Sequence, residues 1–82
     1  MRTTLTTEPR SRKVGRRALA MLAGVRDSTL KFYSEQGLLP FVQAEPGLAR
    51  RYDVDRAIAR LREIEDLRAL GLSIEQVKAR LQ

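Results

Sequence analysis

One short segment, residues 28 to 33, concentrates side chains that can bind an anion or recognise hydrogen-bonding groups. Its polar members, which we expect to point outward from a helix, are Ser28, Thr29, Lys31 and Tyr33. Val25 and Leu30 would face inward from the same region. Hydroxyl, ammonium and phenol groups on one exposed helix face suit base edges in the DNA major groove and phosphate oxygens. The residue types therefore indicate DNA as the partner.

These groups need a rigid support, and the surrounding residues have the pattern of a helix-turn-helix. Gly24 can adopt the positive φ that ends a helix without a Cβ penalty. Ala20, four residues earlier, is small enough for two helices to cross closely. The first helix is predicted over residues 16 to 22, with Leu19 and Leu22 on its inner side. The polar segment then belongs to the second helix, which would be the recognition helix.

The start of the second helix stays open between two residues. Asp27 is the better N-cap by its chemistry. A cap at Arg26 would instead pair Val25 with Leu30 as a hydrophobic staple. Gly37 is expected to end this helix.

A short two-stranded wing is predicted after the second helix. Phe41-Val42 and Arg50-Arg51-Tyr52 have strand-like composition and flank Pro46-Gly47, a strong turn signal. The wing would present two further basic side chains, those of Arg50 and Arg51.

Two further helices complete the predicted domain. Asp53 is placed to cap a long helix, and Ser73 opens a last helix with Gln76 at the capping-box position. The long helix has apolar residues at three- and four-residue steps, namely Val54, Ile58, Leu61, Ile64 and Leu67. Ile74, Val77 and Leu81 of the last helix would pack on this stripe. The fold class is therefore mainly α, a winged helix-turn-helix of four helices and a two-stranded β wing over residues 13–82.

The composition excludes several classes of function. The chain has no cysteine and no histidine, which removes disulfides, thiolate ligands and the commonest general base. The sequence contains no nucleophile-base pair, metal-ligand constellation or glycine-rich phosphate loop. We therefore expect no enzyme, cofactor or metal site. No apolar run approaches the roughly 20 residues of a membrane span, and the basic start lacks a signal-peptide core, so we expect a cytoplasmic, nucleoid-associated protein.

The positive charge is concentrated at the beginning of the chain. The net charge is +6, and residues 1 to 17 hold six basic groups against one acidic group. Residues 1–12 are rich in Thr, Ser, Pro and Arg, which predicts a flexible basic arm that could follow a phosphate backbone. We expect backbone contacts from Arg10, Arg12 and Lys13. The alternative is a solvated tail that only increases solubility.

Five segments in order carry a resemblance to the winged helix-turn-helix domain of the MerR family of bacterial transcription regulators. They are Gly24-Val25 and residues 29 to 33, 35 to 40, 50 to 53 and 67 to 77. The resemblance covers roughly residues 14 to 82. In that family the second helix enters the major groove, its basic-aromatic-aromatic triplet contacts bases and phosphates, and a wing arginine grips the backbone. The resemblance gives these roles to Lys31 and Tyr33, with Phe32 between them, and to Arg50.

The sequence departs from the family pattern at four places. Arg26 stands where a capping Ser or Thr is usual, and Leu48-Ala49-Arg50 replaces Gly-Tyr-Arg, so that the aromatic wing contact is missing. Val42 lies where the wing often has a basic residue. Phe32 replaces the first tyrosine of the triplet and cannot bond a phosphate, and we expect it in the core.

The sequence stops at Gln82, whereas full-length relatives continue into a dimerisation helix and an effector-binding domain. Two interpretations stay open: a DNA-binding fragment of a longer regulator, or a short family-like protein without an effector domain. We expect the chain alone to be a monomer, with a dimer or a head-to-tail assembly on DNA.

The expected function is sequence-specific binding of double-stranded DNA by a transcription regulator. The expected contacts are Arg17, Arg26, Ser28, Thr29, Lys31, Tyr33, Arg50 and Arg51. For Lys31 and Tyr33 the alternative is that they are ordinary surface and half-buried residues of a helix, but the turn before them and the arginine pair after them favour DNA. Two alternatives at the level of the protein are a DNA-architectural protein, such as an excisionase or a plasmid partition-site binder, and a protein-interaction module.

Overall fold

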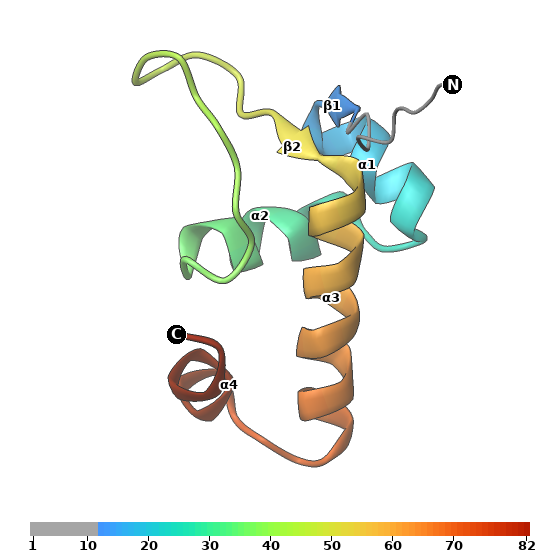
Figure 1. Ribbon diagram of the computed structural model, residues 1–82, viewed down its shortest axis with the longest axis vertical. Helices are drawn as coiled ribbons and strands as arrows, with labels where there is room; N and C mark the ends of the chain where they lie inside the picture. The colour runs from blue at the N-terminus through green and yellow to red at the C-terminus, as the bar shows by residue number, and fades with distance from the viewer. Residues whose placement is uncertain (1–11) are drawn as a thin grey trace, which may run out of the picture.

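A computed structural model of the chain describes residues 12–82, and within this range it contains four helices and a two-stranded antiparallel sheet. The elements in order are β1 (Lys13–Val14), α1 (Arg16–Ala23), α2 (Asp27–Glu35), β2 (Tyr52–Asp53), α3 (Val54–Ala69) and α4 (Ile74–Leu81). Figure 1 shows α3 as the long axis of the molecule, with α1, α2 and the sheet near its start and α4 beside its end. The mainly α fold class is confirmed.

The turn between α1 and α2 closes as the sequence predicts. Gly24 has a φ of 72°, in the left-handed region. The amides of Gly24 and Val25 both donate to the carbonyl of Ala20, at 2.9 and 3.1 Å. Leu19 is fully buried, but Leu22 is 50% exposed, so its predicted inward orientation is wrong. The buried side of α1 is centred on Leu19, Ala20 and Ala23, and Leu22 falls to one side of it.

The start of α2 is at Arg26, whose backbone has the extended conformation of an N-cap. Val25 and Leu30 pack in the same core cluster, as a hydrophobic staple requires. Asp27 lies in the first helical turn, where its Oδ1 accepts from Arg16 Nε at 2.9 Å. The ion pair thus joins the beginnings of α1 and α2, while the staple sets where α2 begins.

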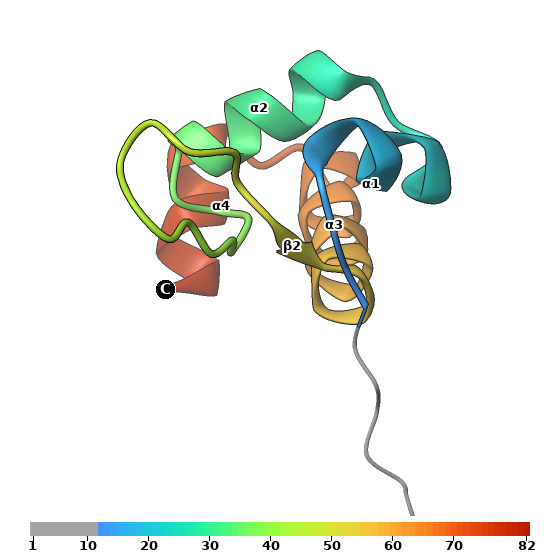
Figure 2. The same ribbon diagram turned by 90° about the horizontal axis from the view of Figure 1, so that it is seen from above.

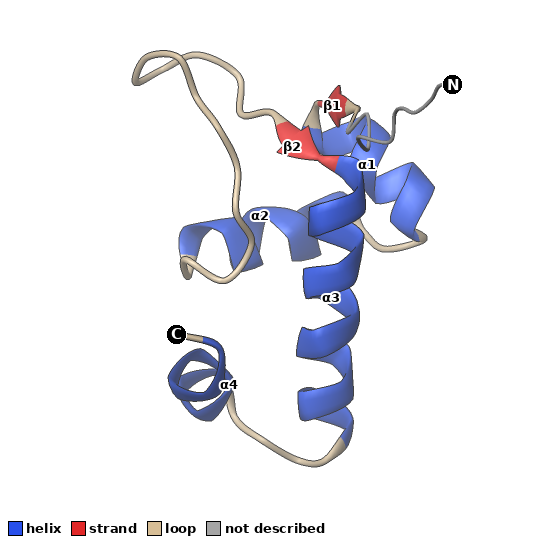
Figure 3. Ribbon diagram, in the orientation of Figure 1, coloured by secondary structure: helices blue, strands red, loops and turns tan. Residues whose placement is uncertain are grey.

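The sheet differs from the predicted wing in its partner. β1 pairs with β2 in the antiparallel register Lys13 with Asp53 and Val14 with Tyr52. In the described part of the chain the wing is paired through one isolated bridge, in which the amides of Val42 and Arg51 each donate to the other's carbonyl at 2.8 Å. Residues 43 to 49 are exposed and bury no apolar face that would extend this ladder. The wing is therefore a loop closed by a bridge, and Figure 3 shows it projecting from the sheet in tan.

The predicted helix caps at the starts of α3 and α4 are both confirmed. Asp53 Oδ1 accepts from the amide of Arg56 at 3.1 Å. At α4 the capping box is complete: the Gln76 amide donates to Ser73 Oγ at 3.1 Å, and the Ser73 amide donates to Gln76 Oε1 at 2.8 Å. Each cap satisfies amide groups that the first turn of a helix leaves without helical partners.

Two groups of buried side chains hold the helices together. The first joins α1, α2, the sheet and the first half of α3, and consists of Leu19, Ala20, Leu30, Leu39, Tyr52, Ala57 and Leu61. The second joins α4 to the second half of α3 and consists of Leu38, Ile64 and Val77. Tyr33 packs against both groups and so links α2 to each half of α3. No helix within residues 12–82 is long and apolar enough to cross a membrane.

Candidate nucleic-acid interface

Helix α2 has one buried and one exposed side. Leu30 and Ser34 are buried, and they lie four residues apart on the inner side of the helix. Ser28 and Lys31 are exposed, and Thr29 is half-buried. In Figure 2, α2 lies along the upper edge of the molecule, with α3 and α4 below it. The hydroxyl of Ser28 and the ammonium group of Lys31 are therefore presented on an outer surface.

The two aromatic residues of α2 have different environments. Phe32 is 43% exposed, so its predicted place in the core is wrong. With a rotation of about 100° per residue, a position midway between Leu30 and Ser34 must lie on the opposite side of the helix. Tyr33 is half-buried between the two core groups, and its ring centroid lies 5.8 Å from that of Phe32.

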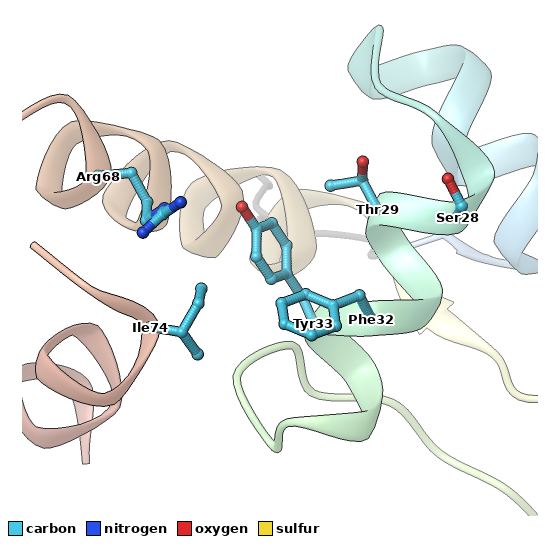
Figure 4. Close-up of a pocket in the computed structure, with 6 residues that line it drawn as sticks. All are labelled: Ser28, Thr29, Phe32, Tyr33, Arg68 and Ile74. Carbon is cyan, nitrogen blue, oxygen red and sulfur yellow. The ribbon is translucent and has the colours of Figure 1, made fainter.

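An open groove of about 400 Å³ lies between α2 and the α3–α4 turn. Its lining residues, shown in Figure 4, are Ser28, Thr29, Phe32, Tyr33, Arg68 and Ile74. The guanidinium of Arg68 and the hydroxyl of Tyr33 point toward one another across the groove in Figure 4. Arg68 comes from the last turn of α3, and its Nη1 donates to the carbonyl of Leu72 at 2.9 Å. The groove therefore combines a fixed cation with hydroxyl donors, which is the chemistry that holds a phosphate.

Arg68 is a candidate contact that the sequence prediction missed. In the sequence it is one of several arginines along α3, and it differs from the others only in being close to the turn residue Gly71. Its proximity to Tyr33 arises because Tyr33 of α2 packs against the group that Leu38 forms with Ile64 of α3 and Val77 of α4. A contact of that kind is non-local and has no signature in residue spacing.

The two wing arginines face different neighbours. The Arg50 guanidinium carbon lies 4.6 Å from the centroid of the Phe41 ring, a cation–π contact. The Arg51 side chain is exposed, and its Nη2 donates to the carbonyl of Lys13 at 3.0 Å. Arg50 thus contacts Phe41 at the base of the wing, whereas Arg51 is hydrogen-bonded to strand β1.

The basic residues before α2 form a third group. Arg17 and Arg26 are exposed on α1 and at the start of α2. Arg16 forms the ion pair with Asp27, and this hydrogen bond lowers the pKa of the Asp27 carboxyl and raises that of the Arg16 guanidinium. Arg16 is therefore engaged within the protein, while Arg17 and Arg26 are accessible to a partner.

Of the residues expected to act from the arm, Arg12 and Lys13 lie apart from α2. Arg10 is outside the described residues. The Arg12 carbonyl accepts from the amide of Val54 at 2.9 Å, and Lys13 pairs with Asp53 in the sheet. Figure 2 shows β1 beginning on the side of the molecule away from α2. The structure thus brings Ser28, Thr29 and Tyr33 together with Arg68, but it does not bring Arg12 and Lys13 into that surface.

The comparisons with known proteins agree with this geometry. Residues 17–82 match the family model described as MerR HTH family regulatory protein. The chain belongs to this MerR family. It is similar to the mercuric resistance operon regulatory protein of Serratia marcescens, with 34% identity over 58 residues that make up 71% of this chain and 40% of that protein.

A solved structure extends the similarity to the fold. The chain resembles HiNmlR, whose crystal structure is described as that of a MerR family regulator lacking the sensor domain, bound to promoter DNA. The TM-score is 0.67 at 28% sequence identity, and the match covers 83% of this chain and 51% of that chain. This MerR-family chain therefore spans about half, or less, of the length of the known proteins it matches.

Proposed function

We propose that this MerR-family domain binds double-stranded DNA as part of a transcription regulator, with α2 in the major groove and the wing against the backbone. The proposal rests mainly on the two sides of α2: Leu30 and Ser34 are buried, whereas Ser28 and Lys31 are exposed. A helix supported in this way can enter a groove without exposing the core. The similarity to a regulator solved on promoter DNA supports the same function.

The proposed contacts divide into base and backbone groups. Ser28 and Lys31, exposed in the early turns of α2, are assigned to base edges, with Thr29 beside them. Tyr33 and Arg68 lie on either side of the groove and are assigned to the phosphate backbone of one DNA strand. Arg17, Arg26 and Arg50 are also assigned to the DNA backbone.

Four further basic residues are proposed as additional contacts to the DNA backbone. Arg51, Arg12 and Lys13 would reach the backbone from the sheet side, in addition to the internal contacts of Arg51 and the Arg12 main chain. Arg10 belongs to the same proposed set by its sequence position. We also propose that the protein acts on the nucleoid, and without catalysis, because its family and fold are those of DNA-binding regulators.

A duplex titration by fluorescence anisotropy at several salt concentrations tests the function. Phosphate contacts release counterions, so log affinity should fall linearly with log salt concentration, by about 0.9 for each neutralised phosphate. Arg50→Ala should reduce the slope by about one. The matched control is Arg62→Ala, which removes the same charge from an exposed position of α3 outside the proposed surface. A salt-independent affinity, or equal effects of both substitutions, would contradict the proposal.

A further inference from the structure

A continuous series of side-chain contacts connects the wing to the recognition helix. The Arg50 guanidinium lies over the ring of Phe41, 4.6 Å from its centroid. The Phe41 ring in turn lies 6.0 Å from that of Tyr52, at an interplanar angle of 57°. The Tyr52 hydroxyl is 2.8 Å from Ser34 Oγ, and Ser34 Oγ donates to the Leu30 carbonyl in α2 at 2.7 Å.

The proton positions in this series follow from the number of available protons. A serine hydroxyl has one proton, and that of Ser34 goes to the carbonyl of Leu30. Ser34 Oγ is therefore the acceptor of the bond with Tyr52, and the tyrosine hydroxyl donates. Both residues are buried, with Tyr52 0% and Ser34 5% exposed. Each hydroxyl thus has a bonded partner inside the core, and the geometry between β2 and α2 is defined by this bond.

The wing backbone alone provides little fixation. Within residues 12–82 the Val42–Arg51 bridge is its one strand pairing. The other hydrogen bonds of the wing, from the Leu48 amide to the Glu45 carbonyl and from Gln43 Nε2 to the Leu48 carbonyl, lie within the exposed residues 43 to 49. An arginine on such a loop would lose side-chain and loop freedom when it bound a phosphate, which weakens the contact. The contacts through Phe41 and Tyr52 restrict Arg50 before DNA arrives.

We propose that Phe41, Tyr52 and Ser34 are positioning residues that hold Arg50 in a fixed place relative to α2, an inference that rests on the proposed DNA-binding function. They act through Arg50 and touch no DNA themselves. The wing and the recognition helix then engage DNA as one preorganised surface. Loss of the Tyr52 hydroxyl should therefore weaken DNA binding only as long as Arg50 is present.

The test is Tyr52→Phe, which removes the hydroxyl and keeps the ring that packs on Phe41. Its effect on duplex affinity is measured in three backgrounds: the unchanged chain, Arg50→Ala, and Lys31→Ala as the matched control on α2. We expect a loss of about threefold to tenfold in the unchanged chain, because binding would then have to order about one additional side chain, that of Arg50. The same loss should persist with Lys31→Ala and disappear with Arg50→Ala.

An equal loss in all three backgrounds would show a general structural role and would overturn the inference, as would the absence of any loss in the unchanged chain. All titrations are made below the melting temperature of every variant, determined by circular dichroism. Ser34→Ala removes the acceptor of the same bond and should give the same pattern, so it serves where Tyr52→Phe does not fold.

Hydrogen exchange provides a readout without DNA. The amides of Val42 and Arg51 close the wing, and their exchange should accelerate in Tyr52→Phe. Unchanged exchange at both amides would contradict the positioning role. A chain that binds no duplex in a salt-dependent way would instead disprove the proposed function, and the exchange rates would still decide whether the hydroxyl bond holds the wing.

Discussion

Removal of the Arg68 side chain is the sharpest test of the groove beside α2. One nitrogen of its guanidinium donates to the Leu72 carbonyl at 2.9 Å, which fixes the group at the end of α3. A guanidinium has about five N–H donors, so several stay available to a phosphate. The arginine is exposed and lies across the groove from Tyr33. Arg68→Ala should therefore remove one preorganised phosphate contact and leave the core intact.

The magnitude follows from counterion release. One lost contact should lower the salt slope by about 0.9, so that the difference in affinity between the two chains shrinks about threefold to fourfold as salt rises from about 50 to 200 mM. Because a phosphate carries no sequence information, the loss should be the same for every duplex. Arg68→Lys keeps the charge but not the planar fork, and it should restore the slope with only part of the affinity.

The assay is fluorescence anisotropy with two duplexes of unrelated sequence at four salt concentrations. Arg62→Ala, which removes an exposed arginine elsewhere on α3, controls for net charge. Thermal unfolding by circular dichroism verifies that all variants are folded. A slope equal to that of the unchanged chain, or equal reductions in both alanine variants, would refute the assignment of Arg68 to a phosphate.

Four further predictions concern specificity, stability, pH and assembly. Lys31→Ala should cost about 1 to 3 kcal/mol of binding free energy and relax the preference at one base position, whereas a uniform loss over all duplexes would make Lys31 a phosphate contact. Ile64→Ala should lower the unfolding free energy by about 2 to 5 kcal/mol in urea titrations, because Ile64 is 0% exposed and packs between Leu38 and Val77; a loss below that range would mean that α4 is held otherwise. The Asp27 carboxyl has a pKa below its ordinary 3.8, so its ion pair stabilises the protein above that pH and is lost as the pH falls through the lowered value; Asp27→Asn should flatten this acid dependence of the melting temperature, and an unchanged dependence would exclude the pair as its source. Sedimentation of the free chain should give a monomer, because the apolar side chains of α4 pack against α3, and a tight dimer at micromolar concentration would reveal an interface elsewhere.

Local patterns predicted the parts of the fold that depend on a few neighbouring residues. Gly24 takes the left-handed conformation that the turn requires, and Asp53 and Ser73 cap their helices. Each of these features depends on backbone groups within four residues, so the sequence contains all the necessary information. The same holds for the exposure of Ser28 and Lys31, which follows once the inner side of α2 is known.

The features that were missed depend on distant partners. Val14, rather than a wing residue, is the strand partner of Tyr52, and this pairing joins segments far apart in the chain. The Ser34–Tyr52 bond and the position of Arg68 likewise exist only after α2, α3 and the sheet have packed together.

The most direct test of the central claim, that α2 binds in the major groove, is methylation interference on a selected site. Duplexes are enriched from a random pool with the purified chain, and guanine N7, which lies in the major groove, is then methylated. We predict an enriched sequence in which methylation at a few guanines blocks binding, with one of these positions relieved by Lys31→Ala. A pool without enrichment, or an enriched site insensitive to N7 methylation, would contradict the account.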